Sequence, residues 1–255
     1  MVAFKTPREL AIMREAGRVV ARTLERVAQA AAPGVRPDEL DAIAARSIKE
    51  HDARPSFTHY HPQWAPNPYP ATLCLSVNDV VVHGIPDARP LRDGDILSID
   101  CGAELGGFHG DAAITIPIGS VDAAATKLIE VTEQALWRGI EAAVVGNRIG
   151  DIGHAVQSVA HAAGYGILDG CTGHGIGTAM HEDPTVPNVG RPHRGLRLRE
   201  GLTIAIEPML IEGGHDDGRV LGDGWAIATA DGSRAAHFEH SIAVTADGPL
   251  VLTAL

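Results

Sequence analysis

The feature that most constrains the fold is a pair of apolar segments joined by two glycines, residues 95–103 and 108–118. The segments, DILSIDCGA and FHGDAAITIPI, are rich in isoleucine and in alternating apolar residues. Such alternation is typical of β-strands, and Gly106-Gly107 between them is a signal for a tight turn. The sequence therefore predicts an antiparallel hairpin.

Each predicted strand carries an aspartate, Asp100 in the first and Asp111 in the second. A turn centred between Leu105 and Gly106 would place them directly opposite each other, with Cβ atoms roughly 4.5–5.5 Å apart. Two buried carboxylates at that distance repel each other and lose hydration. Either they share a proton, or they meet a cation, or the turn has another register and they are not neighbours. The hairpin alone leaves all three open.

Composition places this hairpin in a globular chain of 255 residues with 45% hydrophobic and 21% charged residues. The net charge of −11 argues against a broad electrostatic contact with nucleic acid or an anionic membrane. Three cysteines without a CxxC pair favour a reducing compartment over a disulfide framework. We see no signal-peptide pattern and no run near the roughly 18 apolar residues of a membrane helix. We therefore expect a cytoplasmic protein that binds neither DNA nor membranes.

The order of predicted elements repeats once along the chain. A Thr6 cap, Pro7 and Glu9 are typical of a helix start, and Pro33-Gly34 ends that helix. A second helix over 37–51 and strands over 72–77 and 79–84 lead to the hairpin. After residue 121 the pattern starts again, with helices over 122–145 and from a cap at Asp151 to 163, then strands over 201–210, 225–229 and 236–244. This order predicts an α+β class protein, a single domain over 1–255 built from two equivalent halves.

Three more polar residues occur where a core would prefer apolar side chains. Glu207 lies in TIAIEPML, Glu239 in HFEHSIAV, and His174 among glycines in CTGHGIG. Together with the two aspartates they make four carboxylates and one imidazole, which two divalent ions of total charge +4 would balance. Oxygen ligands with one histidine suit ions such as Mn, Fe, Co or Zn. Two such ions roughly 3.5–4 Å apart can activate a water at neutral pH.

The motifs in this order resemble those of type I methionine aminopeptidase, almost from end to end of the chain. The segments that carry the resemblance are HGIPD (83–87), IDCGAELGGFHGD (99–111), GHGIGTAMHEDPTVPN (173–188), AIEPML (205–210) and FEHS (238–241). The resemblance implies the pita-bread fold, with a pseudo-twofold axis between the halves. It also implies hydrolytic removal of the initiator methionine from nascent proteins whose second residue is small.

The resemblance further implies two divalent metal ions (Co, Mn, Fe, Zn or Ni) and roles for individual residues. Asp100 would chelate one ion, His174 and Glu207 the other, and Asp111 and Glu239 would bridge both. A metal-bridged water would be the nucleophile, with Glu207 as the proton shuttle. Two further histidines, His83 and His181, would contact the scissile amide and steady the tetrahedral intermediate.

The pocket for the methionine side chain would be lined by residues at matching positions: Tyr60, Tyr69, Cys74, Met180 and Trp225. Several features depart from the family pattern: a lengthened loop over 61–70, Met180 where Phe is common, Gly102 where Thr is common, and His237 where Gln is common. Because Met is flexible and packs well on thioethers and rings, we expect methionine specificity to survive with an altered pocket shape.

Other functions were weighed against this one. An Xaa-Pro peptidase of the same fold usually carries a separate N-terminal domain, for which this length leaves no room. A catalytically inactive relative that only binds peptides or ribosomes would have lost metal ligands, and all five positions are filled. No HExxH, GxSxG or Walker A motif occurs. We expect a monomer with a transient ribosome contact, for which the arginines between 191 and 199 are the candidate surface.

Overall fold

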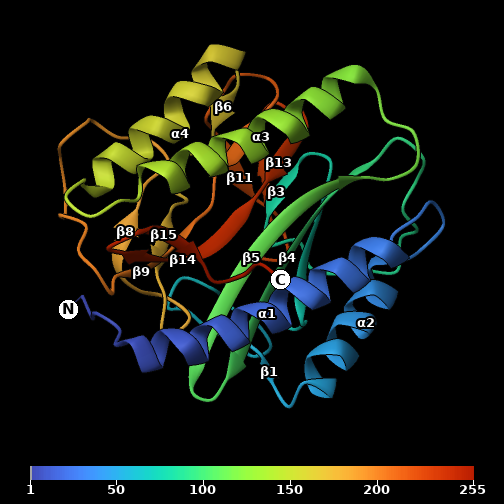
Figure 1. Cartoon of the computed structure of the whole chain (residues 1–255). Coiled ribbons are helices and arrows are strands. Elements are labelled where there is room, and N and C mark those ends of the chain that lie inside the picture. Colours follow the sequence, from blue (N-terminus) through green and yellow to red (C-terminus); the bar gives the residue numbers. More distant parts are fainter. Residues whose placement is uncertain (1) are drawn as a thin grey trace.

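The computed structural model describes residues 2–255 and shows two helices followed by strands, twice over (Figure 1). Helices α1 (Pro7–Ala30) and α2 (Pro37–Glu50) open the first half, and α3 (Ala123–Ala142) and α4 (Ile149–Ala163) open the second. The first-half strands are β1 (Arg54–Pro55), β2 (Leu73–Val77), β3 (Val80–Val82), β4 (Ile96–Leu105) and β5 (Phe108–Pro117). Those of the second half are β6 (Gly166–Ile167), β7 (Gly173–Gly175), β8 (Glu182–Val186), β9 (Thr203–Ile206), β10 (Met209–Ile211), β11 (Gly218–Val220), β12 (Ile227–Thr229), β13 (Ala235–His237), β14 (Glu239–Thr245) and β15 (Gly248–Val251).

The helix starts follow local capping chemistry. The predicted capping box of α1 is present, with Thr6 and Glu9 bonding each other's backbone N–H groups. Helix α4 begins at Ile149, so the prediction that Asp151 is its cap is wrong. Asp151 instead lies in the first turn and accepts a hydrogen bond from the Arg148 N–H at 2.8 Å, which satisfies a donor that the helix leaves unpaired. Among residues 2–255, no helix has the length and apolar character needed to cross a membrane.

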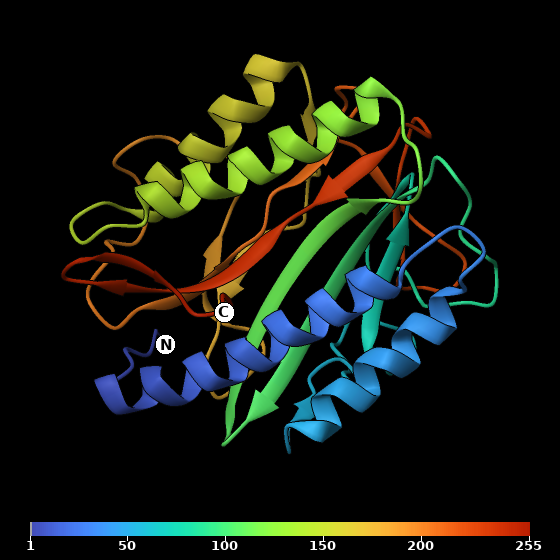
Figure 2. The ribbon, with the colours of Figure 1, turned by 45° about the vertical axis from the view of Figure 1, so that its right-hand side comes forward.

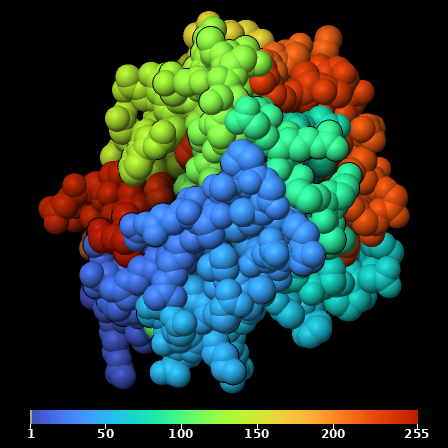
Figure 3. Space-filling view, turned by 90° about the vertical axis from the view of Figure 1, so that its right-hand side faces the viewer, coloured from blue at the N-terminus to red at the C-terminus, as the bar shows by residue number. Residues whose placement is uncertain are grey.

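The strands build one large curved sheet and two small ones. The nine-stranded sheet has the order β1-β4-β5-β14-β9-β7-β8, with β15 added beside β14 and β2 beside β4. Helix α1 packs across β4 and β5, and α3 packs on β14 (Figure 2). In Figure 3 the N-terminal residues (blue) lie below and yellow-green residues of the second half lie above, with C-terminal residues (red) between them at the left edge. The sheet thus has a helix-covered face and a face that is free to line a site.

In the hairpin of β4 and β5 the aspartates do not pair directly, so the turn has another register than the one that would place them opposite each other. Its turn is Gly106-Gly107, where both residues have positive φ (61° and 83°), so Leu105 belongs to the strand. Asp100 therefore pairs with Ala113, and Asp111 pairs with Gly102. The shift of one residue in the turn centre leaves the aspartates diagonal to each other on the same face, because side chains alternate with period two.

The alternation also decides which face the aspartates occupy. Leu97, Ile99 and Ala112 belong to the buried cluster formed with α1 and α2. Asp100 and Asp111 are the direct neighbours of Ile99 and Ala112 in their strands, so their side chains point to the opposite face. The acids therefore project from the face of the sheet that the helices do not cover.

Two strands predicted as continuous are each broken beside an acid. Pro208 lacks an N–H and divides 201–210 into β9 and β10. Phe238 divides 236–244 into β13 and β14, and its N–H donates to the Pro208 carbonyl at 3.3 Å. Strands β10 and β13 pair with each other in a second sheet. Glu207 and Glu239 therefore both lie where the chain passes between the two sheets.

Candidate metal centre

Nearly all side chains predicted for the site line one cavity of about 560 Å³. They are Tyr60, Tyr69, Cys74, His83, Asp100, Asp111, His174, His181, Glu207, Trp225 and Glu239. Met180 is buried in the aromatic cluster beside the cavity, with Phe57, Tyr69 and Trp225, and is not among the lining residues. The structure thus brings together residues from both halves of the chain.

Several cavity residues escaped the sequence interpretation. Phe57, Cys171, Met209 and Val220 line the cavity, although the sequence interpretation assigns no role to any of them. Each comes from a different segment, so only the tertiary structure brings them to the site. The position of His237 was noted in the sequence only as a departure, yet its side chain is 2% exposed and also lines the cavity.

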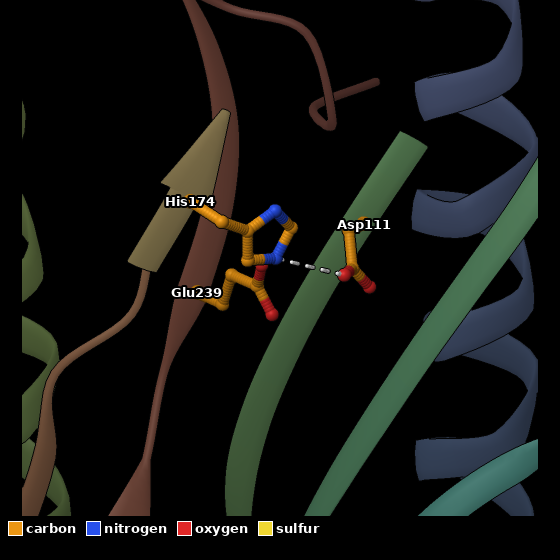
Figure 4. Close-up of side chains that lie close together, drawn as sticks. All are labelled: Asp111, His174 and Glu239. Carbon is orange, nitrogen blue, oxygen red and sulfur yellow. Dashed lines mark ion pairs between the residues drawn. The ribbon is translucent and has the colours of Figure 1, made fainter. Parts of the chain in front are cut away.

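Three side chains from β5, β14 and β7 of the large sheet converge at the centre of the cavity (Figure 4). Ligand atoms of Asp111, His174 and Glu239 all lie within 4.8 Å of one another, and Nε2 of His174 is 3.8 Å from Oδ2 of Asp111. Nδ1 of His174 donates to the Gly175 carbonyl at 2.8 Å. Because a carbonyl only accepts, Nδ1 carries the proton, and the Nε2 lone pair is directed toward the carboxylates, as in a metal ligand.

A second group of potential ligands shares Glu239 with the first. Ligand atoms of Glu207, His237 and Glu239 lie within 4.8 Å of one another. Oε1 of Glu207 is 3.6 Å from His174 Nε2, and Oε2 is 3.5 Å from His237 Nε2. Glu207 thus lies between two imidazoles, and Asp100 lies outside both groups but lines the same cavity.

The carboxylates lack the partners that buried charges require. Burial raises the pKa of Asp100 to about 7. Burial, reinforced by the neighbouring carboxylates, also raises the pKa of Asp111 and Glu239 well above the usual range. Within residues 2–255, each of these three acids has a buried oxygen with no hydrogen-bond donor. Oxygens of this kind beside a histidine nitrogen fit hard or borderline divalent cations.

The pKa values of Glu207, His83 and His181 are lowered, in contrast to those of the three acids above. Burial tends to raise the pKa of Glu207, but His237, His174 and His181 outweigh it and lower that pKa. Burial lowers the pKa of His83 to about 4 and that of His181 to about 3. At neutral pH, Glu207 is therefore ionised, and the imidazoles of His83 and His181 are neutral. The backbone of His83 has a left-handed φ of 59°, which is uncommon outside glycine and marks a residue held by its surroundings.

Buried hydroxyls hold the two central strands together around the acids. Ser241 Oγ donates to the Asp111 carbonyl at 2.8 Å and accepts from the Asp111 N–H at 3.0 Å. Thr115 Oγ1 donates to the His237 carbonyl at 2.8 Å and accepts from the His237 N–H at 2.9 Å. The backbone ladder between β5 and β14 covers only two residue pairs, so these hydroxyls extend it on both sides and fix the acids in place.

An apolar, aromatic wall adjoins the acidic group. Tyr69 is 2% exposed, and its hydroxyl donates to the Leu73 and Gly84 carbonyls. Its ring meets Trp225 edge to face, with centroids 5.0 Å apart. Burial raises the pKa of the adjacent Cys74 thiol, which is therefore neutral. This wall suits an apolar side chain with a polarisable sulfur, which packs well on rings.

The buried acids and His174 could hold a divalent metal ion, and the chain is similar to metal-dependent peptidases. The model of "Metallopeptidase family M24" matches residues 11–246. The chain is 46% identical over 253 residues to methionine aminopeptidase 1 of Bacillus subtilis, with 99% of each chain covered. It is 50% identical over 252 residues to methionine aminopeptidase 1 of Mycobacterium tuberculosis, covering 96% of this chain and 92% of that one.

A solved structure leads to the same group. The crystal structure of methionine aminopeptidase from Rickettsia prowazekii has a TM-score of 0.95 and 37% identity, with 100% of both chains covered. The chain belongs to metallopeptidase family M24, and within that family to the methionine aminopeptidases. The expected α+β pita-bread fold is thereby confirmed.

Proposed function

We propose that this protein removes the initiator methionine from nascent proteins whose second residue is small, by hydrolysis of the first peptide bond. The observation that carries the proposal is the junction of two features in one cavity. Three acids with unsatisfied buried oxygens share the cavity with His174, and an aromatic wall that suits a thioether side chain lies beside them. The methionine side chain would occupy this wall, next to Tyr69, Cys74 and Trp225.

Two divalent ions would be held by the five predicted ligands. Asp111 and Glu239 are central enough to bridge, His174 and Glu207 would complete one site, and Asp100 the other. Glu239 belongs to both groups of potential ligands, which supports a bridging role, and Glu207 Oε1 lies 3.6 Å from His174 Nε2, which supports a site that these two residues share. Such ions, when bound, polarise a carbonyl and lower the pKa of a water molecule. Manganese and cobalt are reasonable first choices for the ions, because both accept mixed oxygen and nitrogen ligands.

The residues of the chain would position the substrate and move its protons. Glu207 is ionised, so it can take a proton from the attacking water and return it to the leaving amine. His83 and His181 line the same cavity as neutral imidazoles, and each can hydrogen-bond the scissile amide or its tetrahedral intermediate. Tyr60 contacts the ring of His181 with centroids 5.1 Å apart and would keep that ring in place.

We further propose that residues 1–255 act as a single catalytic domain, as a monomer in the cytoplasm, with a transient ribosome contact. The exposed arginines between 191 and 199, on a protein of net charge −11, are the candidate contact with ribosomal RNA. Charge reversal at Arg191 and Arg194 should then reduce co-sedimentation with ribosomes. Unchanged co-sedimentation would remove this part of the proposal without affecting the catalytic part.

The proposal is tested by methionine release from Met-Ala-Ser. The protein is stripped with a chelator and assayed before and after addition of Mn²⁺ or Co²⁺, with Met-Lys-Ser and Ala-Pro-Ser as controls. Metal-dependent release from Met-Ala-Ser alone is expected. Cleavage of Ala-Pro-Ser instead would indicate an Xaa-Pro peptidase, and no release with either metal from a folded protein would contradict the proposed hydrolysis.

A further inference from the structure

The mouth of the cavity exposes two large apolar side chains. Trp64 is 59% exposed and Val220 is 63% exposed, and both line the cavity. Exposed apolar side chains at the edge of a binding cavity are typical of a surface that a ligand covers. Trp64 belongs to the lengthened loop over 61–70, and Val220 to the exposed strand β11, so two distant segments form one rim.

The loop that carries Trp64 is held against the body of the protein. The Ala65 N–H donates to the Pro62 carbonyl at 3.1 Å, which closes a turn around Trp64. The indole N–H of Trp225 donates to the Asn67 carbonyl at 3.0 Å. Pro66 packs so closely on Gly224 that a side chain there would meet its ring. The loop therefore presents Trp64 in a fixed place at low conformational cost.

The contacts of Trp64 place it between the two parts of the proposed active site. Its ring lies 4.9 Å from the ring of Trp225, which belongs to the wall proposed for the methionine side chain. It also stacks on His83, with centroids 6.0 Å apart and planes inclined by 26°. A peptide with its methionine against Trp225 and its first bond at His83 would pass Trp64 as it leaves the cavity.

We infer that Trp64 and Val220 form a binding site for the side chain of the third residue of the substrate, and that this site favours apolar and aromatic side chains. The inference rests on the proposed function. An extended peptide advances roughly 3.3–3.6 Å per residue, so a ring 6.0 Å from His83 is one to two residues beyond the scissile bond. The second residue is small and its side chain points to the other side of an extended chain. The third residue is therefore the first that can cover the indole.

The test compares Met-Ala-Phe with Met-Ala-Ser in the metal-loaded enzyme. In the wild type we expect kcat/KM to be roughly twofold to twelvefold higher for Met-Ala-Phe, the range that one aromatic contact supplies. In Trp64→Ala this ratio should fall to about one. Val220→Ser should lower the same ratio by raising KM for Met-Ala-Phe with kcat unchanged. This variant leaves the contact between the rings of Trp64 and His83 intact.

The matched control is Trp137→Ala. Trp137 is 41% exposed on α3, where it contacts His240, and it does not line the cavity. This variant should keep the wild-type ratio.

A wild-type ratio near one, or a ratio that persists in both rim variants, would overturn the inference. Release from Met-Ala-Ser would in that case leave the proposed function standing. The rim variants could instead change the ratio of kcat/KM between Met-Ala-Ser and Met-Thr-Ser, which differ in the second residue. Such a change, without an effect of the third residue, would also overturn the inference. The absence of release from every peptide would overturn the proposed function, and the rim site with it.

Discussion

Nε2 of His174 on β7 lies 3.8 Å from Oδ2 of Asp111 on β5, and the same nitrogen lies 3.6 Å from Oε1 of Glu207. Because Nδ1–H donates a hydrogen bond to the Gly175 carbonyl, the free lone pair at Nε2 is directed between two carboxylates. A cation at this point would interact favourably with all three groups. Within residues 2–255, Asp111 Oδ1 has no hydrogen-bond donor.

Replacement of His174 is expected to weaken metal binding more than it weakens the fold. His174→Ala should lower the affinity for Mn²⁺ by at least about 10²-fold, because even the loss of a group that only orients a ligand costs 10- to 100-fold. Calorimetric titration of the chelator-stripped protein measures this. His154→Ala, on the exposed face of α4, is the control and should bind as the wild type does. Equal affinities in the two variants would contradict a ligand role for His174.

Metal binding is expected to release protons and to weaken in acid. Without metal, burial raises the pKa of Asp100 to about 7 and raises the pKa of Asp111 and Glu239 as well. These acids therefore hold protons near pH 6 that must leave when they become ligands. The affinity for the metal ion should rise with pH up to about 7. Above that pH Asp100 is ionised and contributes no further increase.

The measurement is calorimetric titration with Mn²⁺ near pH 6 in two buffers of different ionisation enthalpy. The difference in apparent binding enthalpy gives the number of protons released. Zero protons released near pH 6 would show that the acids are already ionised in the metal-free protein. Asp38→Asn, an exposed replacement on α2, should not change the number.

Removal of the Ser241 hydroxyl is expected to loosen the centre of the site. Ser241→Ala leaves the N–H and carbonyl of Asp111 without their buried partner, which costs roughly 1–3 kcal/mol for unsatisfied groups of this kind. Urea unfolding of the metal-free protein measures the loss. Ser158→Ala, an exposed replacement on α4, should change stability by less than about 0.5 kcal/mol. A similar small change in Ser241→Ala would count against the bracing role of the hydroxyl.

The effects on stability of substitutions at Gly102 and Met180 are expected to be coupled. A Cβ atom at Gly102 would lie 3.0 Å from Cε of Met180 and 2.9 Å from Phe57 and from Ser56. Met180 thus fills part of the space that a threonine side chain at position 102 would need. Gly102→Thr should destabilise the protein by roughly 1–3 kcal/mol through overpacking.

A double-mutant cycle with Met180→Ala checks this coupling by thermal or urea unfolding. If Met180 is the main obstacle, the cost of Gly102→Thr should be smaller in the Met180→Ala background. Strict additivity of the two changes would place the clash on Phe57 and Ser56 alone.

The sequence by itself determined the helices α1 to α4, the β4–β5 hairpin and the chemical types of the site. Local rules suffice for the Thr6–Glu9 capping box and for the alternation that puts Asp100 and Asp111 on one face, because both depend on neighbours within a few residues. The imbalance of buried acids, with a single histidine among glycines, also required no tertiary information to indicate a cation.

The tertiary structure decided which groups meet and at what distance. Two positive-φ glycines set the hairpin register and make the aspartates diagonal, a backbone choice that composition does not fix. The position of Glu207 between His174 and His237, and of Trp64 over His83, depends on sheet crossings and on loop contacts such as that of Trp225 with Asn67. Such contacts join segments far apart in the chain, and their geometry follows from the packing of the whole core, which local preferences do not encode.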